Sequence, residues 1–556
     1  MFRKARRKIK KTVISFKYYG FKYTMSKIYR SIMAHFRTPY GLWKSLRTPS
    51  VFKLRKQKKM GQGNGPKFSY IVITGSDKCR DLEKSFNRQT YTNYELIKVV
   101  SIEEINEIIP KTKGAYIGFL MPNDRLLPYT LYEIARAIES EQNADLIYTD
   151  HDYIVRGIRK KPVFKPDFSI DYLRSNNYIG RTLLFSRQII EKIGVVNIDY
   201  SVAWFWDYTL RACEMSKHIV HIPDVLYSMG DAPSLNCEEE YRNVLEEHLE
   251  RMGTPGKAYM DSKATGCFRI KYSLKKEPKV SIIIPNKDHV EDLDRCLMSI
   301  IKKQKYTNYE VLIVENNSEN DETFAYYDKI KNKYPVVKIL YWDKEFNYSA
   351  INNFAVDNAE GECILLLNND TQMQHENNIQ ELVSNVMRPE VGIVGARLFY
   401  EDGTIQHAGV IMGYGGLADH AFCGRAGDDS GYGNRIITTS NLSAVTAACL
   451  MVRKEIYLQV GGLEERLKIA FNDVDFCLKV RDAGYLVVYN PYVRLFHYES
   501  KSRGIEDTSE KVKRFEGEVA FAKEKWKGLI EKGDPYYNVN LTLGRKDFSI
   551  KNWSDK

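Results

Sequence analysis

The sequence predicts an α/β protein built from two diverged copies of one βαβ-type domain. The phrase QTYTNYELI at 89–97 returns as QKYTNYEVLI at 304–313, with six of the seven positions from Gln to Glu identical. Each copy lies between a predicted helix and a predicted strand. Further along, KGAYIGFLMPND at 113–124 parallels EGECILLLNND at 360–370. Repetition of whole supersecondary units is most simply explained by tandem domains.

Length and composition are ordinary for a soluble globular chain of two or three domains, with 556 residues, 43% hydrophobic and 28% charged. The turn-rich stretch GQGNGPK at 61–67 indicates a flexible joint. The expected divisions follow from these signals. They are a basic amphipathic segment with linker at 1–66, a first domain at 67–235, a connector at 236–278, a second domain at 279–504, and a C-terminal helix and tail at 505–556.

The N-terminal segment carries all of the positive charge excess. Residues 1–76 contain 20 Lys and Arg and no Asp or Glu, whereas the whole chain has a net charge of +12, so the remainder is acidic. The basic residues alternate with aromatic ones, which favours binding to an anionic membrane surface. A solvated tail and a nucleic-acid-binding arm are the alternatives. Because the rest is acidic and shows no recognition motif, we expect no nucleic-acid partner.

Location is predicted from what the sequence lacks. It contains no run of 18 uninterrupted apolar residues, which argues against a membrane-spanning helix, and no signal-peptide core with a cleavage site. Nine scattered cysteines form no CxxC pair or zinc-type cluster and are expected to be reduced. We therefore expect a cytoplasmic protein, peripheral on the inner face of the cell membrane.

A buried strand leads directly into polar residues at 361–371. Five apolar residues, Cys363 to Leu367, stop at Asn368, Asn369 and Asp370. Such a run is typical of a parallel strand, and ligands of open α/β sheets collect at the carboxyl ends of the strands. Asn368 and Asp370 would there suit a cation that holds a phosphorylated substrate. Alternatively, the motif is a strand end closed by an Asx turn.

The two copies differ where that chemistry would lie. Counting from the shared glycine, Gly114 or Gly361, the positions of Asn368 and Asp370 correspond to Met121 and Asn123 in the first copy. A thioether and an amide are poor ligands for a hard cation. The first copy is therefore predicted to lack the metal site.

The second copy contains the blocks SIIIPNKD, VLIVENNS, FNYSAINNFAV, GECILLLNNDT, DGTIQHAGV, SAVTAACLMVRKE, VGGLEE, FNDVDFCLKVRDAGY and NPYVRLFHYESKSRG. Together, these blocks resemble the inverting family-2 glycosyltransferases of the GT-A fold, in particular the bacterial surface-polysaccharide and rhamnosyltransferase-like branch. The resemblance is dense over 279–504 and looser over the first copy, where YTDHD and FKPDFSIDYLRSNNYIG match the same branch. It implies two tandem GT-A-like, Rossmann-like domains, the first degenerate and the second catalytic.

The resemblance also implies the roles of individual residues. Asp370, with Asn368 in place of the usual Asp, matches the DxD-like motif that holds Mn²⁺ or Mg²⁺ on the donor diphosphate. His497 matches a late histidine that completes this metal site, although a histidine at a strand end is also consistent with a core position. The residues expected around the nucleotide are Pro285, Asn286, Glu315, Asn317, Asn347, Asn353 and Asn369.

Asp473 is the expected catalytic base. In FNDVDFCLKV it matches the Asp of the family's ED motif, with Asn472 replacing Glu. A carboxylate at a helix N-terminus favours the ionised form, as a general base requires; the alternative is that Asp473 only caps the helix. Alignment on the Leu-Arg ending of AWFWDYTLR places Phe205 at this position of the first copy.

The resemblance implies a metal-dependent inverting glycosyltransferase of surface-polysaccharide synthesis. It would move a sugar from a nucleotide-diphosphate donor, dTDP-rhamnose or a UDP-sugar, to a hydroxyl of a lipid-linked glycan. The alternative is a non-catalytic scaffold with two idle domains that organises other enzymes at a membrane. Asn368 and Asn472 favour the scaffold, whereas Asp370, Asp473 and His497, together in one copy, favour the enzyme.

Overall fold

The computed structural model describes residues 38–552 apart from 62–64, 76, 231–236 and 499–507, together with Phe21, Thr24 and Met25. These residues form two compact units. Of the described residues, the N-terminal unit comprises those in Thr38–Ser273 and Pro535–Leu541, and the C-terminal unit comprises those in Leu274–Asp534 and 542–552. Of the basic segment predicted at 1–66, residues 1–37 lie outside the described residues apart from Phe21, Thr24 and Met25.

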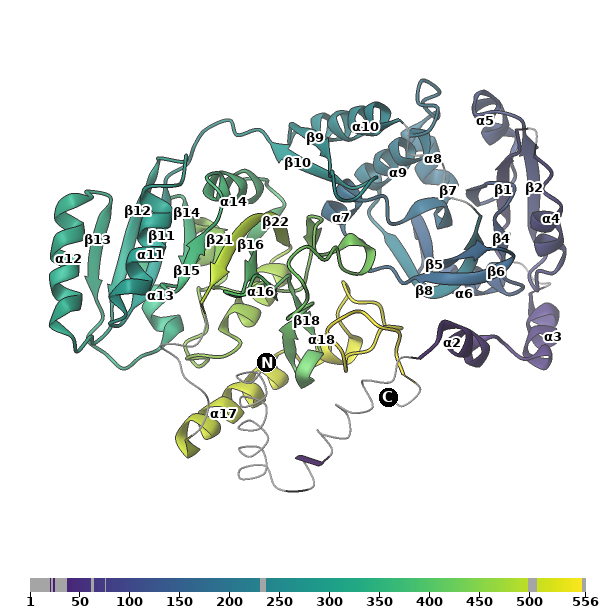
Figure 1. Ribbon diagram of the computed structural model, residues 1–556. Coiled ribbons are helices and arrows are strands. Elements are labelled where there is room, and N and C mark those ends of the chain that lie inside the picture. The colour runs from purple at the N-terminus through teal and green to yellow at the C-terminus, as the bar shows by residue number, and fades with distance from the viewer. Residues whose placement is uncertain are drawn as a thin grey trace. The chain divides into compact units, whose positions relative to one another are not determined.

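The C-terminal unit is built on one mixed sheet (Figure 1). Its strands are, in sheet order, β13 (Val337–Tyr341), β12 (Tyr309–Glu315), β11 (Val280–Asn286), β14 (Cys363–Leu367), β21 (Cys449–Arg453), β16 (Val391–Phe399), β22 (Leu486–His497) and β15 (Thr371–Met373). The first four are parallel, β21 runs antiparallel to β14 and β16, β16 and β22 are parallel, and β15 is antiparallel to β22. β17 (Ile405–His407) pairs with β16, and β20 (Ser440–Asn441) pairs with β22. A separate hairpin joins β18 (Val410–Met412) to β19 (Ala418–His420).

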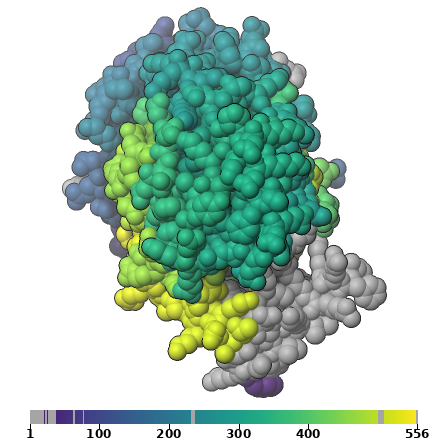
Figure 2. All heavy atoms as spheres, turned by 90° about the vertical axis from the view of Figure 1, so that its left-hand side faces the viewer, coloured from purple at the N-terminus to yellow at the C-terminus, as the bar shows by residue number. Residues whose placement is uncertain are grey.

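Helices with apolar residues at helical spacing cover this sheet. They are α11 (Val290–Ile301), α12 (Asp321–Lys333), α13 (Tyr348–Asp357), α14 (Asn378–Val386), α15 (Lys454–Gln459), α16 (Asn472–Asp482), α17 (Ser509–Lys525) and α18 (Lys527–Lys532). On α11, for example, Leu293, Cys296, Leu297 and Ile300 are buried, which is the spacing of one helix face. They join the core that also buries β11, β14 and β16. Figure 2 shows the face of this unit that contains α12 and β13.

The N-terminal unit has a second mixed sheet (Figure 1). Its order is β2 (Tyr94–Val99), β1 (Phe68–Ile73), β3 (Tyr116–Leu120), β7 (Leu184–Ser186), β5 (Leu146–Val155), β8 (Ile219–Met229) and β4 (Arg125–Leu126), with β6 (Ile158–Val163) paired to β5. β2, β1 and β3 are parallel, β7 is antiparallel to both neighbours, β5 and β8 are parallel, and β4 is antiparallel to β8.

Two apolar clusters cover the faces of the N-terminal sheet. Phe68, Tyr70 and Val72 of β1 belong to one, and Ile71 belongs to the other, as the alternation of side chains along a strand requires. The helices of this unit are α2 (Tyr40–Arg47), α3 (Val51–Met60), α4 (Arg80–Asn87), α5 (Glu103–Ile108), α6 (Thr130–Ser140), α7 (Ile170–Ser175), α8 (Arg187–Ile193), α9 (Trp204–Met215) and α10 (Glu238–Arg251).

Much of the segment assigned from sequence to a connector packs within the N-terminal unit. α10 contacts α9, and the hairpin of β9 (Gly256–Met260) and β10 (Phe268–Tyr272) contributes Ala258 and Phe268 to the same core. The boundaries predicted from sequence remain predictions. The packing nevertheless shows that this segment supports the N-terminal sheet.

One hydrogen-bond motif occurs at the same place in both units. The Gly361 amide donates to Ser281 Oγ at 2.8 Å, and Ser281 Oγ donates to Glu310 at 2.6 Å. In the N-terminal unit Gly114 donates to Ser69 Oγ at 2.7 Å, and that hydroxyl donates to Glu95 at 2.5 Å.

Glycine is required at both positions of this motif, because a Cβ on Gly114 or Gly361 would lie 2.5 Å from the serine nitrogen. The two sheets also share a strand order. The order β2-β1-β3-β7-β5-β8-β4 in the N-terminal unit corresponds, strand by strand, to β12-β11-β14-β21-β16-β22-β15 in the C-terminal unit. The predicted α/β fold class is therefore confirmed, and the shared strand order supports the two tandem copies, which stay a prediction. Among the described residues, no helix is both long enough and apolar enough to cross a bilayer.

Candidate active site

Asp370 and His497 meet because two strands of the C-terminal sheet pair beside them. β14 ends at Leu367, the chain turns through Asn368–Asp370, and β15 begins at Thr371. The turn is closed by the carbonyl of Asn368, which accepts from Thr371 Oγ1 at 2.8 Å. Thr371 lies opposite His497 in the antiparallel ladder. Because the Asn368 backbone accepts this bond, the side chains of Asn368 and Asp370 are not needed for it.

The side chains converge on one nitrogen of His497. His497 Nε2 lies 3.1 Å from Asp370 Oδ1 and 3.4 Å from Asn368 Nδ2. The other ring nitrogen, Nδ1, lies 2.7 Å from Gln406 Oε1.

The orientation of the Gln406 amide follows from its second contact. Its Nε2 donates to the backbone carbonyl of His497 at 3.4 Å, and a carbonyl can only accept. Oε1 therefore faces the imidazole and accepts from Nδ1, which must carry a proton. In the neutral ring the lone pair then lies on Nε2, turned toward Asp370.

This group of atoms suits a divalent cation. Asp370 Oδ1 is buried and has no hydrogen-bond donor, which is costly for a carboxylate oxygen unless a charge compensates it. A carboxylate oxygen, an imidazole nitrogen and an amide are ligands that Mn²⁺ accepts. No group of three or more His, Cys, Asp or Glu in the described part of the chain is arranged for a metal. Asn368, water or substrate oxygens would therefore complete the coordination.

The charge state of Asp370 fits the same role. Burial raises the pKa of this carboxyl, but when His497 also carries a proton on Nε2, its hydrogen bond and charge outweigh burial, so the pKa lies below its ordinary value. Asp370 is therefore ionised at neutral pH. An ionised, buried carboxylate without a donor on Oδ1 is ready to bind a cation.

The predicted nucleotide-binding residues of the first strands form a linked edge. Asn286, next to Pro285 at the end of β11, accepts from Asn369 Nδ2 at 2.6 Å and donates to Tyr327 at 2.8 Å. Asn317 has a positive φ of 56° and donates to the Lys344 carbonyl at 2.8 Å. Strained backbone of this kind is concentrated at binding sites.

Glu315, expected to contact the nucleotide base, is engaged within the protein. It is buried, and its carboxylate accepts from Ser318 N at 2.5 Å, Ser318 Oγ at 2.7 Å and Tyr327 at 2.6 Å. These three bonds fix the turn after β12. Contact with a base remains a prediction, and the structure shows Glu315 shaping the loop on which such a base would lie.

Asn347 and Asn353 hold the loop that leads to Asp473. Asn347 caps α13 by accepting from Ala350 N at 3.2 Å, and it donates to the Glu465 carbonyl at 2.9 Å. Asn353 accepts from Tyr457 at 2.6 Å and from Leu463 N at 2.9 Å. α13 therefore fixes the path of the chain from 463 to 465, which approaches α16. Their predicted contact with the donor is untested.

Asp473 lies half-buried in the first turn of α16. Its Oδ1 accepts from Val474 N at 2.8 Å, and its Oδ2 accepts from Ala447 N at 3.2 Å. The preceding Phe471 has a positive φ of 61°, which marks strained backbone at this position. Asp473 thus makes a bond to its own helix, but it also reaches a separate segment of the chain.

That separate segment connects Asp473 to the turn that carries Asp370. The backbone N–H of Ala447 donates to Asp473, and the backbone carbonyl of the neighbouring Ala448 accepts from the backbone N–H of Asn368 at 3.1 Å. Tyr348, which is half-buried, donates to the Ala447 carbonyl at 3.3 Å. Burial raises the pKa of Tyr348, and the charges of Asp473 and Asp370 raise it further. The predicted base and the predicted metal ligand therefore lie on either side of residues 447–448.

The N-terminal unit lacks the corresponding ligands. Met121 and Asn123 occupy the positions of Asn368 and Asp370, and the strand that corresponds to β22 ends at Met229 instead of a histidine. The next residue, Asp124, is fully buried and is held by Arg181, with Nε at 3.0 Å and Nη2 at 2.9 Å. An internal ion pair takes the place of a cation site.

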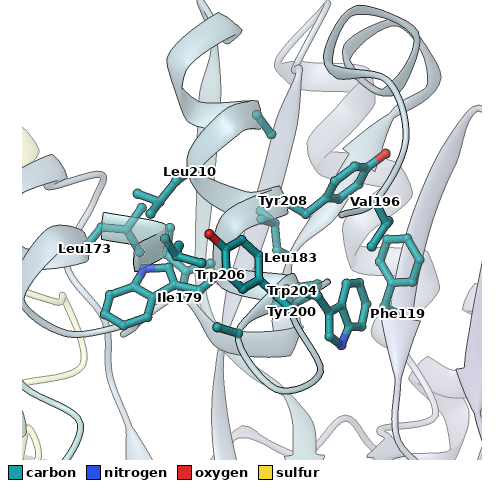
Figure 3. Close-up of a cluster of buried hydrophobic side chains, with 14 of the residues drawn as sticks. Phe119, Leu173, Ile179, Leu183, Val196, Tyr200, Trp204, Trp206, Tyr208 and Leu210 are labelled. Atoms are coloured by element: carbon teal, nitrogen blue, oxygen red, sulfur yellow. The ribbon is translucent and has the colours of Figure 1, made fainter. Parts of the chain in front are cut away.

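The position that corresponds to Asp473 lies in an aromatic core. Figure 3 shows Trp204, Trp206 and Tyr208 of α9 packed in a cluster that includes Phe119. The Phe205 ring lies 6.1 Å from that of Phe119 and 6.0 Å from that of Phe185. No carboxylate lies at this position, because Phe205 is part of the hydrophobic packing.

Sequence reasoning gave no role to Gln406, Tyr348 or Ala447. Gln406 stands in the block DGTIQHAGV, but its partner His497 lies 91 positions later in the chain. Tyr348 has a separation of 99 from Ala447. No short-range pattern predicts contacts over such distances.

The chain is similar to several known proteins. A model described as glycosyl transferase family 2 matches residues 281–460. The chain is 40% identical over 460 residues to the uncharacterized protein y4gI of Sinorhizobium fredii, with 80% of this chain and 50% of that protein covered. It is 36% identical over 458 residues to the O-antigen biosynthesis protein RfbC of Myxococcus xanthus, with 80% and 35% covered. The chain thus spans half or less of the length of these relatives.

Two solved structures also align. One is a mannosyltransferase of Pyrobaculum calidifontis in complex with GDP-mannose and Mn²⁺, with a TM-score of 0.32, 14% identity, and coverage of 47% of this chain and 66% of that one. The other is GalNAc-T7 with UDP, GalNAc and Mn²⁺, with a TM-score of 0.39, 13% identity, and coverage of 51% and 55%. Likeness at this level assigns no residue of the site. The resemblance to glycosyl transferase family 2 is confirmed for residues 281–460 by the family match, and the predicted α/β fold class is confirmed by the two mixed sheets.

Proposed function

Because the chain carries a domain of glycosyl transferase family 2, we propose that it is a metal-dependent inverting glycosyltransferase of bacterial surface-polysaccharide synthesis. The observation that carries this proposal is the arrangement in the C-terminal unit. Asp370 Oδ1, buried and without a donor, faces His497, and Asp473 lies across residues 447–448 from them.

The donor is a nucleotide-diphosphate sugar. Asp370, His497 and Asn368 would hold Mn²⁺ or Mg²⁺, which supplies positive charge to the departing diphosphate. The edge formed by Asn286, Asn369 and Asn317 lies beside them at the carboxyl ends of β11, β12 and β14, where nucleotides bind in open α/β sheets.

Asp473 takes the proton of the acceptor hydroxyl in a single displacement. The acceptor oxygen forms the new bond to the anomeric carbon while the bond from that carbon to the diphosphate oxygen breaks. The electron pair leaves with the diphosphate, and the proton moves to the Asp473 carboxylate. Attack from the side opposite the leaving group inverts the anomeric configuration. The backbone amide of Ala447 orients Asp473 by donating to Oδ2.

The acceptor is a lipid-linked glycan, and the protein binds the inner face of the membrane peripherally through its basic N-terminal region. Relatives named for O-antigen biosynthesis and for rhamnosyl transfer to a diphospho-decaprenol lipid support this acceptor class. The rhamnosyltransferase of Mycobacterium tuberculosis is 35% identical over 65 residues, which are 12% of this chain and 21% of that protein. dTDP-rhamnose and UDP-sugars are the first donors to test.

The non-catalytic scaffold remains the second candidate, because Asn368 and Asn472 replace acidic residues. Asn472 is buried, and its Oδ1 accepts from the Asp473 amide at 2.8 Å. The amide therefore positions the carboxylate beside it. This contact favours the enzyme over the scaffold.

A donor screen with purified protein tests the proposal. Each nucleotide sugar is incubated with Mn²⁺, and release of the nucleoside diphosphate is measured for the parent and for Asp370→Ala. We expect release from one donor class, its loss on chelation, and a fall of orders of magnitude in the variant. Release by Asp370→Ala in the presence of chelator would contradict the metal assignment, and binding of no donor would favour the scaffold.

A further inference from the structure

The first two described helices of the N-terminal unit combine exposed apolar residues with an unbroken positive charge. Residues 38–61 contain seven Lys and Arg and no Asp or Glu. They are Lys44, Arg47, Lys53, Arg55, Lys56, Lys58 and Lys59. Within the same stretch Phe52 is 81% exposed, Leu46 66% and Val51 63%. Single exposed apolar residues need no explanation, but three within seven positions of a wholly cationic segment do.

These helices are attached to the body of the unit along one side. Trp43 of α2 is buried and its ring packs edge-on against Phe164 at 5.1 Å. On α3, Leu54 packs against the core and Gln57 is buried and donates to Glu133 at 3.0 Å. Residues 40–60 are therefore part of a folded surface.

The exposed face of α3 lies opposite its attached face. From Phe52, positions three, four and seven residues later are Arg55, Lys56 and Lys59, all exposed. This spacing places one apolar ring and three cations on a single helix face, whereas Leu54 and Gln57 lie on the other. On α2, Leu42 and Leu46 are one turn apart and exposed. The α2–α3 corner, residues 42–59, is thus apolar at its turn and cationic around it.

We propose that the α2–α3 corner is the membrane-contacting surface of the N-terminal unit, with Leu46, Val51 and Phe52 inserted among anionic lipid headgroups. The charge favours an anionic partner, and exposed Leu, Val and Phe side chains favour one with an apolar interior. Nucleic acid satisfies the first requirement and offers no apolar interior for aliphatic side chains. Because the corner is held by Trp43, Leu54 and Gln57, lipid contact fixes the orientation of the whole unit at the bilayer.

This inference deepens the proposed peripheral membrane location and rests on it. The test uses the full chain and vesicles of phosphatidylcholine with or without one-third phosphatidylglycerol. The variant Leu46→Ser/Phe52→Ser leaves every charge in place, and both side chains are exposed, so the fold is unaffected. The matched control is Val195→Ser/Ile198→Ser, which removes two apolar residues of the same unit that are 66% and 47% exposed. Binding is measured by vesicle sedimentation, with thermal melting as the check on folding.

We expect the parent and the control to bind the anionic vesicles, and the Leu46/Phe52 variant to bind at least ten-fold more weakly with an unchanged melting curve. Equal binding by parent and variant would overturn the inference while leaving the membrane location standing, because the contact would then lie elsewhere. Absence of parent binding would overturn both. A variant that keeps vesicle binding but loses binding to single-stranded RNA would show that the corner is a nucleic-acid surface. None of these measurements depends on sugar transfer.

Discussion

Gln406 determines which nitrogen of His497 faces the cation site. It accepts from Nδ1 and donates to the His497 carbonyl, so the amide cannot rotate without losing one bond. Side chains that orient a metal-binding histidine in this way affect metal affinity although they touch no metal.

Gln406→Leu should therefore weaken Mn²⁺ binding about ten- to a hundred-fold. Binding is measured by electron paramagnetic resonance or calorimetry, without substrate. The tautomer of His497 is read from imidazole ¹⁵N shifts in the metal-free protein. Gln406→Glu keeps an acceptor toward Nδ1 and should retain most of the affinity. If Gln406→Leu binds Mn²⁺ as the parent does and the tautomer is unchanged, Gln406 has no positioning role.

Asp473 provides the second prediction about a single residue. Asp473→Asn keeps the shape of the side chain and its bond from Ala447, but an amide cannot take a proton. Transfer should fall by about 10²- to 10⁴-fold while donor affinity stays within a few-fold of the parent. Turnover and nucleotide binding are measured separately, and loss of both together would identify Asp473 as a donor contact or a structural cap.

At the level of elements, the sequence predicted what depends on local pattern. The apolar run Cys363–Leu367 is a central strand, and the helix that begins near Asp473 is α16. Continuous apolar runs and helical spacing are local patterns of the sequence, so the strands and helices that they predict are the ones that form in the fold. The meeting of Asp370 with His497 came from a resemblance, because residues 127 positions apart share no local pattern.

Other parts of the site could not be read from the sequence. The three hydrogen bonds that Glu315 accepts from Ser318 and Tyr327 were not predicted, and its contact with a nucleotide stays a prediction. The bonds that join Asn353 to Leu463 were not predicted either, and its contact with the donor also stays a prediction. A polar side chain at a strand or helix end serves either a ligand or a neighbouring loop, and only the tertiary packing distinguishes the two.

The C-terminal turn at 545–549 provides an element-scale prediction on pH. Asp547 accepts from Arg545 Nη2 at 2.7 Å and from Ser549 Oγ at 2.5 Å, and it fixes the turn that stacks Phe548 on Phe422, with ring centroids 4.6 Å apart. Burial raises the pKa of Asp547, but its bonds to Arg545 and Ser549 outweigh burial and lower the pKa to about 2.

A depressed carboxyl pKa stabilises the fold above the unfolded value of 3.8, and this stabilisation is lost as the pH falls toward 2. Asp547→Asn should therefore melt at a lower temperature than the parent at pH 6, and the difference should shrink between pH 4 and pH 3. Thermal melting at each pH provides the measurement. A difference that is constant down to pH 3 would show that the charge of Asp547 does not contribute.

At the level of the whole molecule, two units share a strand order and one hydrogen-bond motif, but they differ at the positions predicted for the metal ligands and the base. The C-terminal unit has Asn368, Asp370, His497 and Asp473, whereas the N-terminal unit has Met121, Asn123, Met229 and Phe205 at the corresponding places. Its buried Arg181–Asp124 pair and its aromatic core stabilise a fold without a cation site.

The full chain should therefore bind one nucleotide diphosphate and one catalytic Mn²⁺, although it contains two related sheets. Calorimetric titration of the parent should give one site per chain for each ligand, and Asp370→Ala should remove the cation site and with it the cation-dependent part of nucleotide binding. Asn123→Ala, the matched change in the N-terminal unit, should alter neither, because its neighbour Asp124 is neutralised by Arg181 within the protein. A stoichiometry of two nucleotides per chain, with the second lost in Asn123→Ala, would show that the N-terminal unit has kept a binding site and would overturn this division of labour.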